Sequence, residues 1–446
     1  MQADVQYLQK KIVILAPLEY LICLTESFHR MKRIFFAVLV FILSADATFG
    51  QQQMSESKAE KDSSINKNIS SNPLRFSGYI QTQYQYGERY ATLKVGGSNT
   101  DNNKNFNRIG IRRGRIKMQY EKGIVEGVFQ VDVTEKGFRI KDVYISLKDP
   151  WKGIFSLNAG IFNLPFGYEV SYSSSRRASP ERAKVITTLF PDERDIGAML
   201  TLEGPDSSMW KNFKLELGVI GGNATNMELD NHKDFIAHLT YHNQLSSKLN
   251  LGGGFSYYSG GVYQGNANVY SMENNSFILN SNIKNVGDYA LRRYFGADLQ
   301  VLFKTNWGAS QIYGEYIFGS QPGGINSTES PDYTSLPDED TYIRNFTGGY
   351  ITFVQELGGS NVSFIAKYDC YDPNIKVEKN ELGSGGTTKA DVAYKTFGSG
   401  LLWQLKNGLR LTGYYDWILN EKSANLTGYE KDISDNVFTL RLQYKF

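Results

Sequence analysis

The chain has 446 residues, of which 41% are hydrophobic and 21% charged, and it contains 43 glycines, 29 tyrosines and only 11 prolines. Its formal net charge of +2 gives no bulk attraction for nucleic acid, and two cysteines are too few for a disulfide framework. Abundant glycine and tyrosine favour many strands joined by polar loops, in one large all-β unit or in several domains.

Residues 1–50 have the pattern of an N-terminal extension followed by an export signal. A basic pair follows Met31, an apolar stretch fills 34–43, and small residues offer cleavage after Ala47 or Gly50. This is the three-part plan of a secretory signal peptide, and its apolar stretch is too short for an ordinary transmembrane helix. We expect the true start at Met31; one unusually long leader is the alternative.

Residues 51–73 are polar and without periodicity, which predicts a disordered linker in the periplasm. No later apolar run reaches the length of a transmembrane helix. The chain is therefore expected to be exported, and any membrane insertion must be by strands.

From Leu74 onward, stretches of about ten to thirteen residues alternate apolar with polar side chains, which is the pattern of half-buried strands. About sixteen such strands follow one another, an even number, as expected for a bacterial outer-membrane barrel. The expected strands are 74–86, 107–120, 123–134, 137–148, 153–163, 196–204, 211–220, 233–243, 247–258, 291–305, 307–318, 342–356, 361–371, 389–404, 408–420 and 435–446.

The connections alternate between short turns and long loops, with the turn at 135–136 as the exception. Short periplasmic turns and long extracellular loops are typical of a Gram-negative outer-membrane barrel. A soluble sandwich is the alternative, but sixteen strands of this length form a tube too wide to fill with side chains. The sequence therefore predicts an all-β transmembrane antiparallel β-barrel over residues 74–446, with its apolar face in lipid and its polar face toward a water-filled lumen.

The last strand alternates to its final residue, with Tyr444 and Phe446 on the apolar face. In a closed barrel the last strand must pair with the first, so it cannot fray. An aromatic end of this kind is similar to the C-terminal assembly signal that the β-barrel assembly machinery reads.

The segment "LNAGIFNLPFGYEVSYSSSRRASPERAKVITTLFPDERDIGAML", residues 157–200, resembles the phosphate-selective porin O/P family. The matching elements are the G-x-F-x-x-P-F-G-x-E turn at 160–169, the Ser- and Arg-containing stretch at 173–177, "ER" at 181–182 and R-D-x-G at 194–197. "IRRGRIKMQYE" at 111–121 is similar to the family's Arg-rich second strand. The resemblance implies an outer-membrane porin, a homotrimer, and a third extracellular loop that folds inward and narrows the pore.

Loop 164–195 supports that implication, because it contains Val170, Val185, Ile186, Leu189 and Phe190, which a loop wholly in water would not need. Packed against the barrel wall, these residues would bury their apolar surface. The alternative is an external loop with a small core of its own.

A cationic stripe is expected on the second strand, because Gly114, Ile116, Met118 and Tyr120 form its lipid face and leave the intervening basic residues facing the lumen. Rings of Arg and Lys favour anions in narrow pores. Glu126 and Asp132 on the next strand temper the charge, and loop 164–195 carries five acids for its five basic residues. We expect a moderate anion preference, with phosphate or polyphosphate as candidate solutes. The anion-attracting residues are predicted to be Arg113, Arg115, Lys117, Arg176, Arg177, Arg182 and Lys184.

Two other functions compete with a diffusion porin. An outer-membrane hydrolase would normally use a histidine base, but His238 and His242 lie about 13 Å apart along a strand and cannot ligate one metal together. A surface scaffold or adhesin with a plugged lumen would use the long loops for binding and would not conduct. We expect no catalysis and no cofactor or metal, small hydrophilic or anionic solutes and membrane lipid as partners, and a thiol at Cys370 without redox function.

Overall fold

The structure of the protein is a computed structural model that describes residues 73–329 and 335–446. The predicted extension and signal peptide at 1–50, and all but the last residue of the linker at 51–73, lie outside the described residues and stay predictions. None of the helices in the described part of the chain is long and apolar enough to cross a membrane.

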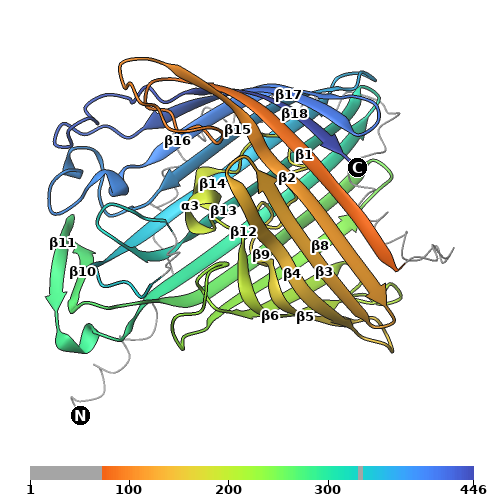
Figure 1. Ribbon diagram of the computed structural model, residues 1–446, viewed down its shortest axis with the longest axis horizontal. Coiled ribbons are helices and arrows are strands. Elements are labelled where there is room, and N and C mark those ends of the chain that lie inside the picture. Colours follow the sequence, from red (N-terminus) through yellow and green to blue (C-terminus); the bar gives the residue numbers. More distant parts are fainter. Residues whose placement is uncertain (1–72, 330–334) are drawn as a thin grey trace, which may run out of the picture.

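Sixteen strands of the described residues form one closed antiparallel barrel, as predicted (Figure 1). Neighbouring strands pair in chain order, because each antiparallel pair needs only a turn or loop between its members. The strands of the barrel wall are β1 (Leu74–Gly87), β2 (Phe106–Lys122), β3 (Val125–Thr134), β4 (Gly137–Lys148), β5 (Phe155–Asn163), β6 (Arg194–Glu203), β7 (Phe213–Ile220), β8 (Asp234–Gln244), β9 (Leu249–Tyr263), β12 (Tyr289–Thr305), β13 (Gly308–Gly323), β14 (Thr341–Glu356), β15 (Val362–Asp372), β16 (Tyr394–Gln404), β17 (Leu409–Asn420) and β18 (Val437–Lys445).

The barrel closes where β18 pairs with β1, in a register that runs from Tyr79 opposite Lys445 to Gly87 opposite Val437. Beyond that ladder, the backbones of Gly78 and Phe446 exchange two hydrogen bonds of 3.0 Å each. The final strand is thus paired to its end, and no open sheet edge remains in the wall.

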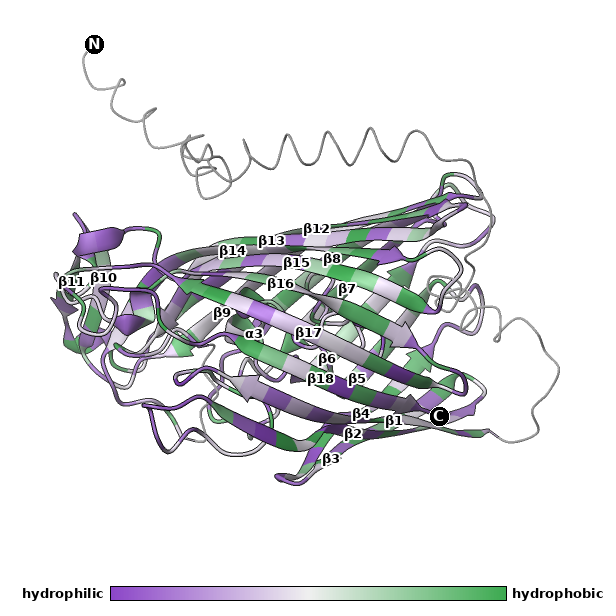
Figure 2. Ribbon diagram, turned by 90° about the horizontal axis from the view of Figure 1, so that it is seen from above, coloured by the Kyte–Doolittle hydropathy of each residue, from purple (hydrophilic) through white to green (hydrophobic). Residues whose placement is uncertain are grey.

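Alternation along each strand separates an apolar outer face from a polar inner face, which is visible as alternating colours along the strands in Figure 2. On β1, Phe76 and Ile80 are exposed, whereas Gln81, Gln83 and Gln85 are buried inside the barrel. Exposed apolar side chains and buried amides on one strand are the inverse of a soluble sandwich, and they suit a wall in lipid around a polar lumen.

Connections at one end of the barrel are short and those at the other end are mostly long. The turns between β2 and β3, at 123–124, and between β12 and β13, at 306–307, have two residues each, whereas residues 164–193 separate β5 from β6. The turn at 135–136 between β3 and β4 is the exception that the sequence also showed.

The strands β9 and β13 end at Tyr263 and Gly323, five residues beyond their expected ends at 258 and 318. Two further expectations about the long loops were also wrong. The predicted loop 259–290 contains a hairpin, β10 (Asn268–Glu273) and β11 (Ser276–Ser281), which lies at the long-loop end of the barrel (Figure 1). Its six-residue strands are too short for a periodic signal, and tertiary contacts hold them: Tyr270 stacks on Tyr342 at 4.4 Å, and β10 pairs in parallel with the start of β14.

The second correction concerns β16, which was predicted to begin at residue 389 and begins at Tyr394. Asp391 accepts the N–H of Thr388 and pairs with Arg344, so these residues form a capped turn instead of strand. This turn is η4 (Lys389–Asp391), and the other short helices are η2 (Ile283–Asn285), η3 (Lys379–Glu381) and α3 (Lys184–Leu189).

Candidate functional site: the lumen and its inner loop

The segment between β5 and β6, residues 164–193, contacts the inner faces of strands far from it in sequence, and we call it the inner loop. Tyr79 and Ser174 share a hydrogen bond of 2.6 Å between their hydroxyls, and Gln81 Nε2 donates to the Ser174 carbonyl at 3.1 Å. Gln443 Nε2 on β18 donates to the Ser175 carbonyl at 3.1 Å. Both views place α3, which belongs to this loop, within the barrel outline (Figures 1 and 2).

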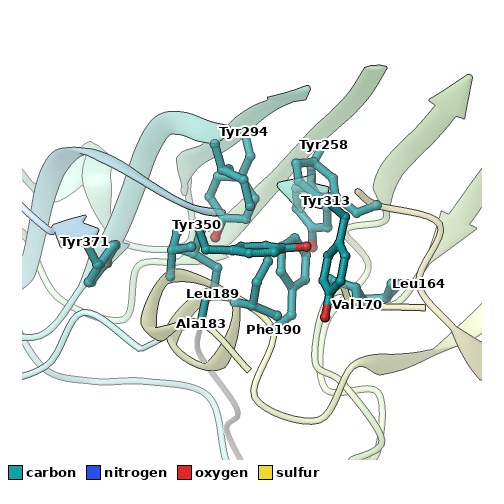
Figure 3. Close-up of a cluster of buried hydrophobic side chains, with 14 of the residues drawn as sticks. Leu164, Val170, Ala183, Leu189, Phe190, Tyr258, Tyr294, Tyr313, Tyr350 and Tyr371 are labelled. Carbon is teal, nitrogen blue, oxygen red and sulfur yellow. The ribbon is translucent and has the colours of Figure 1, made fainter. Parts of the chain in front are cut away.

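One part of the inner loop is apolar and packs against an aromatic stretch of the wall. Phe166 and Phe190 lie 5.0 Å apart, and Phe190 meets Tyr294 of β12 edge-on at 5.8 Å. Figure 3 shows Leu189 and Phe190 among tyrosines contributed by β9, β12, β13, β14 and β15. The loop residues Val170, Val185, Ile186, Leu189 and Phe190 are all at most 4% exposed.

Helix α3 approaches the wall closely because β14 has a glycine where the two meet. A Cβ at Gly348 would lie 2.8 Å from the side chain of Val185. At the start of α3, Glu169 Oε2 accepts the N–H of Ala183 at 2.9 Å, which satisfies a backbone donor that the short helix cannot. The helix is therefore fixed by its apolar face and by a carboxylate from earlier in the same loop.

The turn that opens the inner loop requires glycine at position 167. Gly167 has a φ of 57°, and a Cβ there would lie 1.5 Å from Glu315 Oε1 on β13. This close approach lets Glu315 Oε2 accept the N–H groups of Tyr168 at 3.2 Å and Glu169 at 3.1 Å. The P-F-G-x-E motif thus has a physical role in aiming the chain into the lumen.

The other part of the inner loop is charged, and Glu181 is at its centre. Arg112 donates to both carboxylate oxygens of Glu181, at 2.9 and 2.8 Å, and Arg441 Nη2 donates at 2.6 Å. Arg113 Nη2 lies 3.7 Å from the same carboxylate. One carboxylate of the loop therefore meets three guanidinium groups from β2 and β18.

Opposing effects act on the ionisation of Glu181. Burial raises the pKa of its carboxyl, but the charges of Arg112, Arg113 and Arg441 hold that pKa well below its ordinary value. Glu181 is therefore a carboxylate throughout the neutral and mildly acidic range.

Further cations hold the backbone of the same segment. Arg441 Nη1 donates to the Pro180 carbonyl at 2.6 Å, and Lys367 Nζ of β15 donates to the Glu181 carbonyl at 3.3 Å. Arg410 Nη2 of β17 donates to the Arg177 carbonyl at 3.1 Å. Segment 177–182 is thus held by basic side chains from several strands of the wall.

Ion pairs also close the base of the inner loop. Arg182 pairs with Glu193 and donates to the Glu169 carbonyl at 2.8 Å. Arg194 pairs with Asp142 of β4 at 2.6 Å and with Glu193 at 3.1 Å. The balance of acidic and basic residues within the loop therefore does not give the charge of the lumen, because carboxylates of the loop also pair with cations of the barrel wall.

The structure places the predicted strand residues on the inner face. Arg113 and Arg115 are 3% and 6% exposed, and Lys117 is half-buried. Arg113 donates to Gln81 Oε1 at 3.3 Å, and Arg115 pairs with Asp132 at 3.4 Å, so the anticipated neutralisation by β3 is real for Arg115.

The predicted loop residues divide into buried and accessible ones. Arg177 and Arg182 are buried, Arg176 is half-buried, and Lys184 is exposed with its Nζ 4.4 Å from the ring centre of Tyr394. At the chain end, the side chains of Tyr444 and Phe446 are exposed and lie 5.9 Å apart, ring to ring.

Arg112 was missed by sequence analysis. Strict alternation would place it outside, beside Gly114 and Ile116, but a register shift in the β1–β2 ladder pairs Gln81 with Arg113 and Thr82 with Ile111. This β-bulge turns Arg112 inward together with Arg113. No sequence signal marks the bulge, whereas Arg410 and Arg441 lie at polar positions of clearly alternating strands and could have been included.

The lumen also contains buried acids and a buried histidine. His238 Nε2 lies 3.1 Å from Asp298 Oδ2 on β12, and both side chains are buried. Within the described residues no group of three or more His, Cys, Asp or Glu side chains is placed to hold a metal ion. What the geometry offers chemically is a set of fixed guanidinium groups facing a polar lumen, which suits the transient stabilisation of anions.

Residues 89–283 match the family model described as phosphate-selective porin O and P, which confirms the resemblance seen in the sequence. The chain is similar to the high-pH structure of OprB from Pseudomonas putida, with 9% identity and a TM-score of 0.53 over 90% of this chain and 99% of that chain. It is also similar to OmpF from Salmonella typhi in complex with daunomycin, with 12% identity and a TM-score of 0.50 over 84% and 98% of the two chains. At such identities these likenesses show the fold alone. No curated protein matches the chain.

Proposed function

We propose that this chain, which belongs to the phosphate-selective porin O and P family, is an outer-membrane diffusion porin that passes small hydrophilic solutes with a moderate preference for anions. The observation that supports the anion preference most is the surplus of cations around segment 177–182 of the inner loop. Arg112, Arg113 and Arg441 share one carboxylate, that of Glu181.

The physical argument is that fixed cations in a narrow pore replace part of the water that a passing anion loses. Charges interact far more strongly in a partly desolvated lumen than in bulk water. Backbone carbonyls hold Arg410 and Arg441 in place, so these guanidinium groups attract an anion from fixed positions. A passing cation meets the same field as a barrier.

The outer surface of the barrel supports a location in the outer membrane. Its wall exposes apolar side chains on every sector, such as Ile80 on β1, Phe255 on β9 and Leu440 on β18. Such a surface belongs in lipid. We propose that the barrel reaches the outer membrane through the signal peptide and is inserted by the β-barrel assembly machinery, with Tyr444 and Phe446 as the assembly signal. The family resemblance favours a homotrimer, and crosslinking that yields only monomers would argue against it.

The direct test of a porin is conductance of the purified barrel in a planar bilayer. We expect discrete, long-lived conductance steps. Replacing chloride by phosphate in the same recording then shows which anion the channel favours. A phosphate current that saturates at low phosphate concentration would support a dedicated phosphate channel. Equal currents for the two anions would support a general preference for anions.

The competing function is a surface scaffold whose lumen is plugged. It is favoured by the tight packing of the inner loop against the wall, since Arg177 and Ile186 of the loop and Gln81 of β1 are all at most 1% exposed. A scaffold gives no conductance steps, so the same bilayer recording separates the two functions. A hydrolase is disfavoured by the lumen chemistry, and clear turnover of ester or peptide substrates by the pure barrel would contradict the porin proposal.

A further inference from the structure

Glu181 meets three arginines of the wall at once. Two other carboxylates of the inner loop also reach the wall, since Glu169 pairs with Lys367 of β15 and Asp192 pairs with Arg139 and Lys141 of β4. Glu193 pairs with Arg182 and Arg194, which lie near it in the chain, whereas Glu181 faces arginines of β2 and β18. Its side chain is 19% exposed, but those of Arg113 and Arg441 are 4% and 3% exposed. A carboxylate on the lumen side therefore covers guanidinium groups that belong to the wall.

The backbone of this segment does not depend on that carboxylate. The carbonyls of Arg177, Pro180 and Glu181 accept hydrogen bonds from Arg410, Arg441 and Lys367, respectively. The loop is also packed through α3 on the opposite side. If the Glu181 carboxylate moved away from the arginines, these other contacts would still hold the backbone of segment 177–182 in place.

The neighbourhood also has hydrogen-bonding capacity that the described residues do not use. Arg177 Nη1 and Arg410 Nε are buried and have no hydrogen-bond partner there, although each guanidinium makes other contacts. Arg177 is 1% exposed and Arg410 is 4% exposed. Buried donors of this kind are satisfied by water or by an anion, so the neighbourhood is suited to an additional acceptor.

We propose that Glu181 is a tethered counter-ion that occupies a cage formed by Arg112, Arg113 and Arg441, and that the carboxylate of a passing solute exchanges with it. This inference rests on the proposed anion-preferring function and names small carboxylate ions as a favoured class of solute. The cage already binds a carboxylate, with Arg112 in the two-bond geometry that a guanidinium forms with two coplanar oxygens.

Exchange is physically reasonable because it never leaves the cage empty. Removing one partner of a buried ion pair is costly, since a charge stays behind without compensation. When a solute carboxylate enters as Glu181 leaves, the guanidinium groups keep a partner throughout. Glu181 thereby weakens the binding of solute anions enough for them to leave again, as conduction requires.

The test is block of the chloride current by acetate at constant ionic strength, in single barrels of the wild type and of Glu181→Gln. Glutamine keeps the size of the side chain and removes the competing charge. We expect the acetate concentration for half-block to fall at least about fivefold in Glu181→Gln, the equivalent of about 1 kcal/mol, and the anion preference to rise. Glu181→Asp, which retains the charge, should remain close to wild type.

The matched control is Glu121→Gln, because Glu121 also pairs with an arginine, Arg75 at 3.0 Å, but far from the cage. It should leave the acetate block unchanged. Unchanged block in Glu181→Gln, or a lower anion preference in that variant, overturns the role of Glu181 while leaving the proposed function intact. A wild-type barrel that is silent or cation-selective overturns the proposed function itself. Should Glu181→Gln fail to insert, Arg112→Gln replaces it: weaker acetate block than wild type supports the cage, and unchanged block refutes it.

Discussion

The two parts of the inner loop meet two different walls of the same barrel. The apolar part, with Phe166, Leu189 and Phe190, packs on tyrosines of β9, β12, β13 and β14, whereas the charged part, with Arg177 and Glu181, meets arginines of β2, β17 and β18. Salt does not screen the packing of buried apolar groups, whereas it does screen ion pairs that border water. The comparison teaches that the two walls hold the loop by different forces, one by apolar packing and the other by charged hydrogen bonds. In the function that we propose, the charged wall also presents its cations to the solute.

The largest effect is expected when the apolar part loses its anchor. Phe190→Ala removes a side chain that is 4% exposed and in contact with Tyr258 and Tyr294, which should cost about 3–5 kcal/mol of loop anchoring. We expect a larger and noisier conductance together with a lower midpoint of thermal unfolding.

The control for that experiment is Met227→Ala, since Met227 is 77% exposed in the loop between β7 and β8. It should change neither quantity. If Phe190→Ala behaves like Met227→Ala, the apolar part of the inner loop does not fix its position.

A smaller effect is expected on the charged side when a compensating acid is removed. Asp132→Asn leaves Arg115 without its ion-pair partner at 3.4 Å and so exposes more positive potential to the lumen. We expect the anion-to-cation permeability ratio to rise roughly twofold, the equivalent of about 0.4 kcal/mol. Reversal potentials in a salt gradient measure this ratio, and a decrease would show that Arg115 does not act on passing ions.

Because Glu181 stays ionised, we expect the anion preference not to depend on pH between pH 7 and pH 5. Its arginine neighbours hold the pKa of Glu181 well below the ordinary value despite burial, so its ion pairs persist as pH falls from 7 to 5 and are lost only below the depressed pKa. Anion preference should therefore stay constant between pH 7 and pH 5. A rise across that window that is absent from Glu181→Gln would mean that Glu181 gains a proton there.

The smallest effect is expected at Cys370, which belongs neither to the apolar nor to the charged part of the inner loop and its walls. Its neighbours Asp369 and Tyr371 are buried on the inner side, whereas Cys370 alternates with them and is half-buried. Cys370→Ser should leave conductance and selectivity unchanged. A changed conductance would place the thiol in the permeation path.

Alternation alone predicted most of the wall. For β17 the expected range was 408–420 and the observed strand is Leu409–Asn420, because each residue there has one face in lipid and one in the lumen. The pattern failed where tertiary contacts decide the conformation. The hairpin β10–β11 depends on the stacking of Tyr270 on Tyr342, and neither ring signals this contact in the sequence.

The residues of the site could be predicted only in part from the sequence, again because tertiary contacts decide which side chains meet. Arg113 and Arg115 follow from the alternation of β2, but Arg112 turns inward through a bulge that no residue type announces. The partners of Glu181 are brought together by closure of the barrel, which sets β2 and β18 on either side of β1. The sequence of loop 164–195 has equal numbers of acidic and basic residues, and only the fold shows that its carboxylates also pair with cations of the barrel wall.

The central claim is that basic residues of the charged wall produce anion preference, and the reversal potential in a salt gradient tests it most directly. The comparison is between wild type, Arg113→Gln with Arg115→Gln, and a control that loses two exposed charges elsewhere, Lys104→Gln with Lys211→Gln. We predict anion selectivity in the wild type and in the control, and a clear loss of it in the arginine double variant. Cation selectivity in the wild type, or an unchanged reversal potential in the arginine double variant, would contradict the account.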